Sequence, residues 1–328
     1  MISISVIIPV YNAEKFLRTA VESALREPET SEVILVEDGS SDNSLAICRQ
    51  LASESSKVRL FQHVDGKNRG VSASRNLGLV KAQSEFIAFL DADDFFLPGR
   101  FKDTVRCFEI NMGCDGVFEA LGSYIQDQSS YDAWKRAGLD IPDLIVIDHP
   151  EPPERLFKQL ITGSNGYLSL DCFVMKKSLL KSVGFLDETL RYFEDTQYFF
   201  RLAAVGSLFP GSIDKAVALR RVHPSNTIIA NRSRKQKFED RNKLWVTSYR
   251  WLRSKKLTQQ SDLVIHRMVS HFASGPQSLN KTQSSYWKSI VQRLRMLLLL
   301  TRVPDLVFRR HFWAEFLPDR FNNPSERH

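Results

Sequence analysis

The stretch that decides the fold is ISVIIPV at residues 4–10, followed at once by YNAEKFLRTAVESAL at residues 11–25. The first run is apolar and mostly β-branched, as expected for a buried strand. In the second, apolar residues recur at helical spacing, at Phe16, Leu17, Ala20, Val21 and Ala24. The sequence therefore begins with a strand that leads directly into an amphipathic helix.

The same strand-then-helix pattern recurs three more times. The pairs are 32–36 with 44–52, 58–63 with 71–82, and 85–90 with 100–110. Strands that alternate with amphipathic helices favour a mainly parallel sheet covered by helices on both faces, a Rossmann-like α/β fold. Further strands are expected within 115–125 and 172–175, and helices at 177–183 and 196–204. Residues 126–153 lack periodicity and predict an insertion or loop.

Polar and acidic residues follow three of these strands. The first strand ends in Pro9-Val10-Tyr11-Asn12, the second in Glu37-Asp38-Gly39-Ser40-Ser41-Asp42, and the fourth in Asp91-Ala92-Asp93-Asp94. Open α/β sheets bind ligands beyond the carboxyl ends of their strands. The candidate site is therefore this edge of the sheet.

The four residues Asp91 to Asp94 are the first candidate for metal chemistry. Mg²⁺ and Mn²⁺ prefer carboxylate oxygens and commonly bridge them to a diphosphate. Taken alone, the carboxylates could equally end the strand and cap the next helix. Asp38 is open to the same two interpretations, as a helix cap or as a hydrogen-bond acceptor for a base or ribose.

Two further segments combine charge with a helix start. Residues 66–70, GKNRG, precede a helix that carries Arg75, and cations at a helix N-terminus hold phosphate, although a solvated turn remains open. Glu194 and Asp195 lie among aromatic residues, whose partial desolvation would raise a carboxyl pKa and favour proton acceptance, although they could also serve the helix dipole. His223 is a candidate metal ligand or phosphate contact, or a structural residue.

No single motif identifies a protein family, but six motifs in this order and spacing resemble one. They are VIIPVYN at 6–12, VEDGSSD at 36–42, NRGVSASRNLGL at 68–79, FLDADD at 89–94, FED at 193–195 and RRVHPSN at 220–226. Together they resemble the family 2 glycosyltransferases, which have the GT-A fold. The resemblance covers residues 1–226, which we expect to form the nucleotide-sugar-binding and catalytic domain.

The resemblance implies an inverting, metal-dependent, hexosyltransferase-like enzyme that uses a nucleotide-diphospho-sugar, with UDP favoured. It implies Asp195 as catalytic base with Glu194 beside it, and Mn²⁺ or Mg²⁺ held by Asp93, Asp91 and His223. The implied nucleotide-sugar-binding residues are Pro9, Tyr11, Asn12, Glu14, Asp38, Asn68, Arg75, Asp91, Ala92 and Asp93. Two departures matter: Glu37 stands where many relatives have Asp, and no QxxRW motif of the processive polymer synthases is found. Transfer of one sugar at a time is therefore expected.

Residues 227–328 are expected to form a basic, mainly helical region. Residues 201–328 hold 24 Lys and Arg against 8 Asp and Glu, whereas residues 1–200 hold 21 against 30. Apolar residues recur at helical spacing at Trp287, Ile290, Val291, Leu294, Leu297 and Leu298. Such a helix lies in an anionic membrane interface or packs on a catalytic domain, and both remain open. No nucleic-acid recognition motif accompanies the charge, so nucleic acid is not an expected partner.

These expectations together suggest synthesis of a cell-surface polysaccharide or glycolipid on a glycan or lipid-linked acceptor. The apolar run at 2–10 has no basic segment before it, so we expect no signal peptide and a cytoplasmic enzyme, peripheral at the inner face of the membrane if the basic region binds lipid. The alternatives are a catalytically silent protein that binds nucleotide sugar or a partner, and a nucleotidylyltransferase. The latter usually needs a Gly-rich basic loop where this chain has Tyr11-Asn12-Ala13-Glu14.

Overall fold

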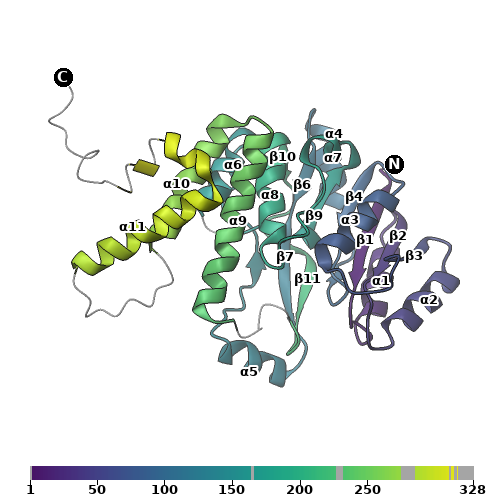
Figure 1. Cartoon of the computed structure of the whole chain (residues 1–328). Coiled ribbons are helices and arrows are strands. Elements are labelled where there is room, and N and C mark those ends of the chain that lie inside the picture. The colour runs from purple at the N-terminus through teal and green to yellow at the C-terminus, as the bar shows by residue number, and fades with distance from the viewer. Residues whose placement is uncertain are drawn as a thin grey trace. The chain divides into compact units, whose positions relative to one another are not determined.

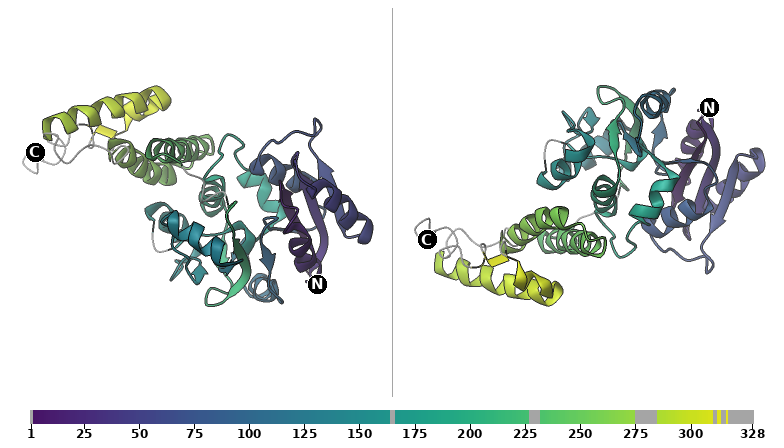
Figure 2. Two further views of the ribbon diagram at one scale, coloured as in Figure 1. Left: turned by 90° about the horizontal axis from the view of Figure 1, so that it is seen from below. Right: turned by 90° about the horizontal axis from the view of Figure 1, so that it is seen from above.

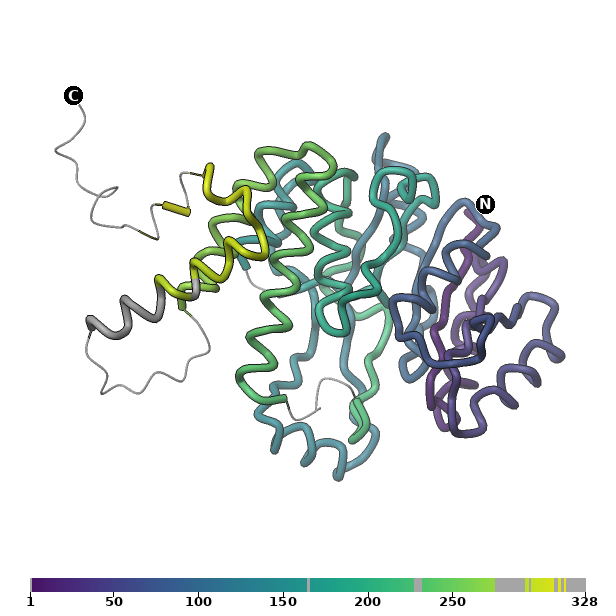
Figure 3. The backbone as a smooth tube through the Cα atoms, in the orientation of Figure 1, coloured from purple at the N-terminus to yellow at the C-terminus, as the bar shows by residue number. Residues whose placement is uncertain are grey.

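The computed structural model describes residues 2–163, 166–226, 232–274, 285–309, 312–313 and 316, without the side chains of 285–292 and 295. The chain forms two compact units, Met1–Asn231 and Arg232–His328 (Figures 1 and 3).

A seven-stranded sheet forms the centre of the first unit (Figure 1). Its strand order is β10-β6-β9-β4-β1-β2-β3. The bounds are β1 Ile4–Val10, β2 Thr30–Glu37, β3 Val58–Gln62, β4 Phe86–Phe89, β6 Gly116–Phe118, β9 Phe173–Lys176 and β10 Leu208–Pro210. All neighbours run parallel except β9, which is antiparallel to both β4 and β6. This confirms the predicted mixed, mainly parallel α/β sheet.

Helices cover both faces of this sheet (Figure 2). Helices α1 (Leu17–Leu25) and α2 (Ser44–Glu54) pack through buried apolar side chains on the face formed by alternate residues of β1 and β2. On the other face α3 (Val71–Lys81) approaches β1 closely, because a Cβ at Gly78 would lie 2.4 Å from Ile7 Cγ2. The close approach fixes the position of α3 and of the polar residues on it.

A smaller four-stranded sheet adjoins the first, in the order β5-β11-β7-β8. Its strands are β5 Phe95–Phe96, β11 Ala216–Val222, β7 Ala120–Ile125 and β8 Leu144–Ile145. The strand expected at 115–125 therefore divides between the two sheets. The break falls at Glu119, whose buried carboxylate pairs with Arg100 and cannot lie within an apolar strand.

The interpretation of residues 126–153 as an aperiodic insertion was wrong over much of its length. This segment contains α5 (Gln128–Arg136) and β8, and it leads into α6 (Pro153–Thr162). Asp127 caps α5 by accepting a hydrogen bond from the Ser130 amide, and Trp134 is fully buried. The buried Trp134 and the Asp127 N-cap stabilise this helix, although its sequence lacks repeated apolar spacing.

The other elements of the first unit are α4 (Lys102–Ile110), η1 (Leu170–Cys172), η2 (Lys177–Leu179), α7 (Leu180–Val183) and α8 (Glu194–Val205). The second unit contains α9 (Arg234–Ser254), α10 (Thr258–Ser274), α11 (Ser285–Arg302) and η4 (Pro304–Phe308). A capping box between Ser233 and Gln236 starts α9, and α10 packs against both α9 and α11. Of the helices that the structure describes, none is long and apolar enough to traverse a lipid bilayer.

Candidate active site

The loops after β1, β2 and β4 meet at one edge of the large sheet. Val10 pairs with Glu37 at the ends of β1 and β2, and Ile7 pairs with Phe89 at the end of β4. The polar residues that follow these strands therefore lie side by side, as the sequence predicted.

Asp38 fastens the loop that leads into α3. Its side chain is buried, and its two oxygens accept hydrogen bonds from the backbone amides of Arg69 and Gly70 at 2.7 and 2.9 Å. His63 Nε2 lies 3.4 Å from the same carboxylate. His63 was missed by sequence reasoning, since a lone histidine one residue after β3 carries no motif. These contacts join the end of β2, the residue after β3 and the start of α3 at the sheet edge.

Gly39 lets the loop after β2 pass the loop before α3. It has a φ of +70°, and a Cβ there would lie 2.7 Å from the Asn68 amide nitrogen. Both facts exclude any larger residue without displacement of the backbone. Asn68 itself is exposed. The two loops thus cross at contact distance.

The loop after β1 holds the start of α2. The Asn12 side-chain oxygen accepts a hydrogen bond from a backbone amide of the loop after β2, and Glu14 accepts two from Asn43, one from its amide and one from its side chain. Asn12 and Glu14 therefore act within the scaffold. Tyr11 is 52% exposed beside half-buried Pro9, so its ring is available to a ligand.

Arg75 joins Asp91, a candidate for metal and donor binding, to Glu194, a candidate for catalysis. Its side chain is 5% exposed, with Nη2 2.7 Å from Asp91 Oδ1 and Nη1 3.2 Å from Glu194 Oε1. The neighbouring carboxylates raise the pKa of Arg75 against the opposing effect of burial. Two of its nitrogens are thus engaged by carboxylates, so Arg75 acts here as a buried counter-ion within α3.

Asp93, in the loop between β4 and β5, contacts His223, which follows β11. Asp93 Oδ2 lies 2.9 Å from His223 Nε2, and the Arg221 Nε donates to the Asp93 carbonyl oxygen at 3.0 Å. His223 is buried against the Phe16 ring at 4.7 Å between centroids, which restricts its orientation. Ala92, between the two aspartates, is buried and leaves Asp91 and Asp93 to face outward.

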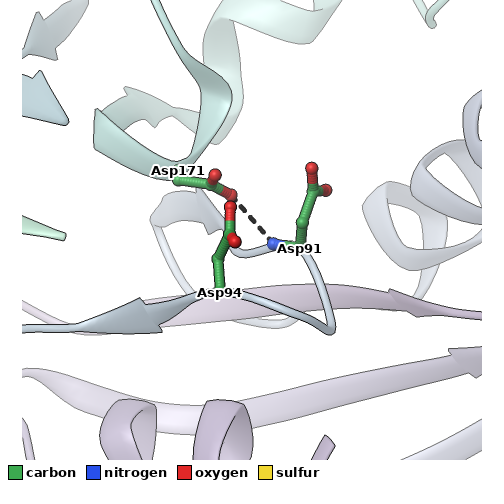
Figure 4. A group of neighbouring side chains, drawn as sticks. All are labelled: Asp91, Asp94 and Asp171. Atoms are coloured by element: carbon green, nitrogen blue, oxygen red, sulfur yellow. Dashed lines mark hydrogen bonds between the residues drawn. The ribbon is translucent and has the colours of Figure 1, made fainter. Parts of the chain in front are cut away.

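A second acidic group lies beneath them: Asp91, Asp94 and Asp171 bring one oxygen each within 4.8 Å (Figure 4). Asp171 accepts a hydrogen bond from the Asp91 amide at 2.8 Å, and Asp94 accepts one from the Arg221 amide at 2.8 Å. Figure 4 shows the Asp94 and Asp171 carboxyls converging while that of Asp91 points away. Asp171 was not singled out in the sequence, because no motif surrounds it.

Asp94 and Asp171 are both buried, and burial raises the pKa of each carboxyl. Burial, then the charge of Asp93, raises the pKa of Asp94 well above its usual range. Burial, then the charge of Asp91, raises the pKa of Asp171 to about 7. Two adjacent buried carboxyls share a proton readily. Because Asp171 also accepts the Asp91 amide, the Asp94–Asp171 pair stabilises the turn at residues 91–94.

Among the described residues, Asp91, Asp94 and Asp171 form a group whose ligand atoms lie within 4.8 Å of one another, and a second, outer set of donors lies beside it. The side chains of Asp91 and Asp93 are 40% and 32% exposed, and Asp93 converges with the His223 imidazole. Carboxylate oxygens with an imidazole nitrogen suit Mn²⁺, and carboxylates suit Mg²⁺. In the inner pair, Asp171 and Asp94 each accept one hydrogen bond from a backbone amide.

Glu194 and Asp195 begin α8 behind a strained residue. Phe193 has a φ of +63°, which is uncommon outside glycine and re-aims the chain into the helix. Burial, then the charge of Asp195, raises the pKa of Glu194 to about 7, against the lowering effect of Arg75. Burial also raises the pKa of Asp195, whose Oδ1 accepts the Thr196 amide at 2.5 Å. Glu194 can therefore exchange a proton near neutral pH, and the pKa of Asp195 is shifted in the same direction.

The family model for "Glycosyl transferase family 2" matches residues 5–184, which include β1, the loop after β2, the start of α3 and the Asp91–Asp94 turn. The chain belongs to glycosyl transferase family 2. The match covers more than half of the chain. It confirms the family predicted from the motifs.

Known relatives agree with this membership. The succinoglycan biosynthesis protein ExoU of Rhizobium meliloti is 30% identical over 209 residues, which cover 63% of this chain and 58% of that protein. The first four curated relatives are matched over 39% to 77% of their own lengths.

Solved structures show the same fold. S. aureus TarS 1–349 in complex with UDP-GlcNAc aligns with a TM-score of 0.63 and 18% identity, covering 98% of this chain and 93% of that one. The mannosyltransferase PcManGT from Pyrobaculum calidifontis, in complex with GDP-Man and Mn²⁺, aligns with a TM-score of 0.50 and 13% identity, covering 98% and 87%. The fold of the family 2 glycosyltransferases is therefore that of this chain.

Proposed function

We propose that this chain is an inverting, metal-dependent glycosyltransferase that moves a hexose-type sugar from UDP to a hydroxyl of a glycan or lipid-linked acceptor. The observation that carries the proposal is the position of Arg75, which contacts Asp91 on one side and Glu194 on the other. One buried residue thus links the candidate diphosphate side of the site to the candidate proton acceptor.

The donor nucleotide would bind at the edge of the large sheet, against the loop after β2 and the loop before α3. The exposed Tyr11 ring offers a stacking surface, and the Asp38 carboxylate keeps lone pairs for a base beyond those used by the two amides. The UDP-GlcNAc bound by TarS and the GDP-Man bound by PcManGT support a nucleoside-diphosphate sugar. The resemblance to the family 2 glycosyltransferases favours UDP as the nucleotide.

Asp93, Asp91 and His223 would hold a divalent cation beside the diphosphate. Such a cation supplies Lewis-acid stabilisation of the negative charge that the departing diphosphate develops. The contact of His223 with Phe16 keeps the imidazole directed at Asp93, and Arg221 fixes the backbone of the same turn. The protein therefore presents these donors without rearranging its backbone.

Asp195, with Glu194 beside it, would accept the proton of the acceptor hydroxyl as the oxygen attacks the anomeric carbon. Attack opposite the leaving diphosphate inverts the configuration at that carbon. A base with a raised pKa accepts a proton more strongly at neutral pH. Arg75 opposes the rise for both carboxyls, which keeps a fraction of the pair ionised.

Isothermal titration of UDP, GDP and dTDP, with Mn²⁺ and then with EDTA, tests the donor site. We expect one nucleotide to bind at least ten times more tightly with Mn²⁺, and Asp93→Asn to remove that dependence. Asp65→Asn is the matched control, because Asp65 is an exposed carboxylate paired only with Arg69 and the neighbouring backbone. A folded protein that binds none of the three would favour a catalytically silent, partner-binding protein.

We also propose that α11 contacts an anionic membrane surface. Met296 and Leu299 are fully buried, yet Leu294, Leu297 and Leu298 are 47% to 62% exposed. The helix carries four cations and no acidic residue. Leucines beside cations suit a lipid interface. The side chains of Trp287, Ile290 and Val291 lie outside the described residues.

Flotation with phosphatidylglycerol-containing vesicles tests this contact at physiological salt. The wild type should float, Leu297→Asp with Leu298→Asp should not, and the control Met112→Asp should, because Met112 is an exposed apolar residue of the first unit. Absence of wild-type flotation would exclude the membrane proposal.

A further inference from the structure

Arg220 lies directly beside the residue that holds the Asp91–Asp94 turn. Arg221, the next residue on β11, donates its amide to Asp94 and its Nε to the Asp93 carbonyl. Consecutive strand residues point to opposite faces, so Arg220 points to the face of the small sheet opposite to that of Arg221. That face carries α5, because the Arg220 guanidinium lies 5.0 Å from the ring centroid of Trp134.

Tyr167 meets Arg220 from a second segment tied to the same turn. Its hydroxyl lies 3.4 Å from Arg220 Nη1, and its side chain is 49% exposed. Gly166 holds this segment against the Val146 carbonyl, where a Cβ would lie at 1.8 Å. Four residues after Tyr167, Asp171 accepts the Asp91 amide. Arg220 and Tyr167 are therefore each linked to the Asp91–Asp94 turn, Arg220 through its neighbour Arg221 and Tyr167 through the segment that ends at Asp171.

The charge of Arg220 has no carboxylate partner among the described residues. Arg75 and Arg100, two of the buried arginines of the same unit, each pair with a carboxylate. Arg220 instead rests on an aromatic ring and a tyrosine hydroxyl, and its buried Nε makes no hydrogen bond within the described structure. An arginine that is held in place but has no counter-ion favours an external anion, which its planar fork binds through two parallel hydrogen bonds.

We propose that Arg220 and Tyr167 form an acceptor subsite that binds an anionic oxygen group, a phosphate or a carboxylate, carried by the acceptor. The exposed Tyr167 ring offers an apolar face to the adjoining sugar or polyol. The subsite rests on the proposed transferase function for its link to catalysis. It makes an acceptor that bears such a group the preferred substrate over a neutral one.

The test is titration of glycerol 3-phosphate and of glucuronate, with glycerol and glucose as neutral counterparts. Each is titrated with UDP and Mn²⁺ present, so that the donor phosphate site is filled, and again without them. We expect one of the two anions to bind the wild type and the neutral compounds not to bind. Which anion binds distinguishes a phosphate source from a carboxylate source.

Arg220→Gln should weaken this binding at least tenfold while leaving UDP affinity within twofold. Arg220→Lys, which retains charge but loses the planar fork, should be intermediate. Arg155→Gln is the matched control, because Arg155 is 72% exposed and forms only a surface pair with Glu151. Tyr167→Ala, at an exposed ring, reports on the subsite if Arg220→Gln fails to fold.

Three outcomes would overturn the proposal. They are equal anion binding by Arg220→Gln and wild type, equal binding of neutral and anionic compounds, and a loss of UDP affinity in Arg220→Gln that matches the loss of anion affinity. The last would assign Arg220 to the donor diphosphate. Failure of the wild type to bind UDP refutes the proposed function instead, and the titrations without UDP still decide whether Arg220 holds an anion.

Discussion

Replacement of Arg75 by methionine tests the link between the two halves of the site. Methionine keeps much of the length of the buried stem but removes the charge, so Glu194 and Asp91 lose their shared counter-ion. Asp91 is 40% exposed and can be hydrated, whereas the Glu194 side chain is 14% exposed and cannot. The loss should therefore fall mainly on Glu194.

The magnitude follows from the burial of the ion pair. Removal of one partner from a buried pair destabilises a protein by about 3–5 kcal/mol. In a domain of this size each kcal/mol lowers Tm by roughly 2–4 °C, so a loss on the order of 10 °C is expected at pH 8. At pH 6 the loss should be smaller, because the pKa of Glu194, about 7 with Arg75 present, rises further without it and the carboxyl takes up a proton.

Thermal unfolding of the wild type and three variants at both pH values measures this effect. Arg69→Met is the control, since Arg69 forms only an exposed pair with Asp65, worth about 0–1 kcal/mol. Glu194→Gln added to Arg75→Met should recover more than half of the lost stability, because it removes the stranded charge. An Arg75→Met protein no less stable than Arg69→Met at pH 8 would refute the assignment of Arg75 as a buried counter-ion.

Three further predictions concern the loops and the carboxyls. Gly39→Ala should destabilise the first unit by at least about 1 kcal/mol more than Gly138→Ala, measured by urea unfolding, because both have a φ near +70° but only the Gly39 Cβ meets other backbone atoms. Asp195→Asn should lower kcat by about 10²–10⁴ without changing UDP affinity; near-native turnover would contradict its role as base. The folded pKa of Glu194, about 7, exceeds its ordinary value of 4.5, so its contribution of about 3 kcal/mol is present at pH 4 and lost as the pH rises through 7. Wild-type stability should thus fall more between pH 5 and pH 8 than that of Glu194→Gln.

The sequence predicts well those features that depend on neighbouring residues. Strands with buried faces, helices with apolar spacing and acidic strand ends are local patterns, and Asp38, Asp91 and Asp93 follow from them. The spacing also predicts a helix at 196–204, which the structure extends to begin at Glu194. What it cannot give is the partner of each charge, because Arg75 meets Glu194 across 119 positions of sequence.

Features formed by single distant contacts were missed for the same reason. Asp171 reaches the Asp91 amide, and His63 reaches Asp38, without any periodic or motif signal at either residue. Helix α5 depends on one capping aspartate and one buried Trp134, too few residues to produce a period. Glu14, a donor contact implied by the family resemblance, accepts two hydrogen bonds from Asn43, and its role toward the donor stays a prediction.

Under the proposed function, the crossing of the loops at Gly39 and Asn68 limits how nucleotide specificity can change in evolution or by engineering. The loops share the carboxylate of Asp38, and the loop after β2 cannot gain a side chain at Gly39 without moving the loop before α3. A graft of one loop from a relative of different base preference would meet an unmatched surface. The two loops should therefore be exchanged together, as one cassette that includes the start of α3.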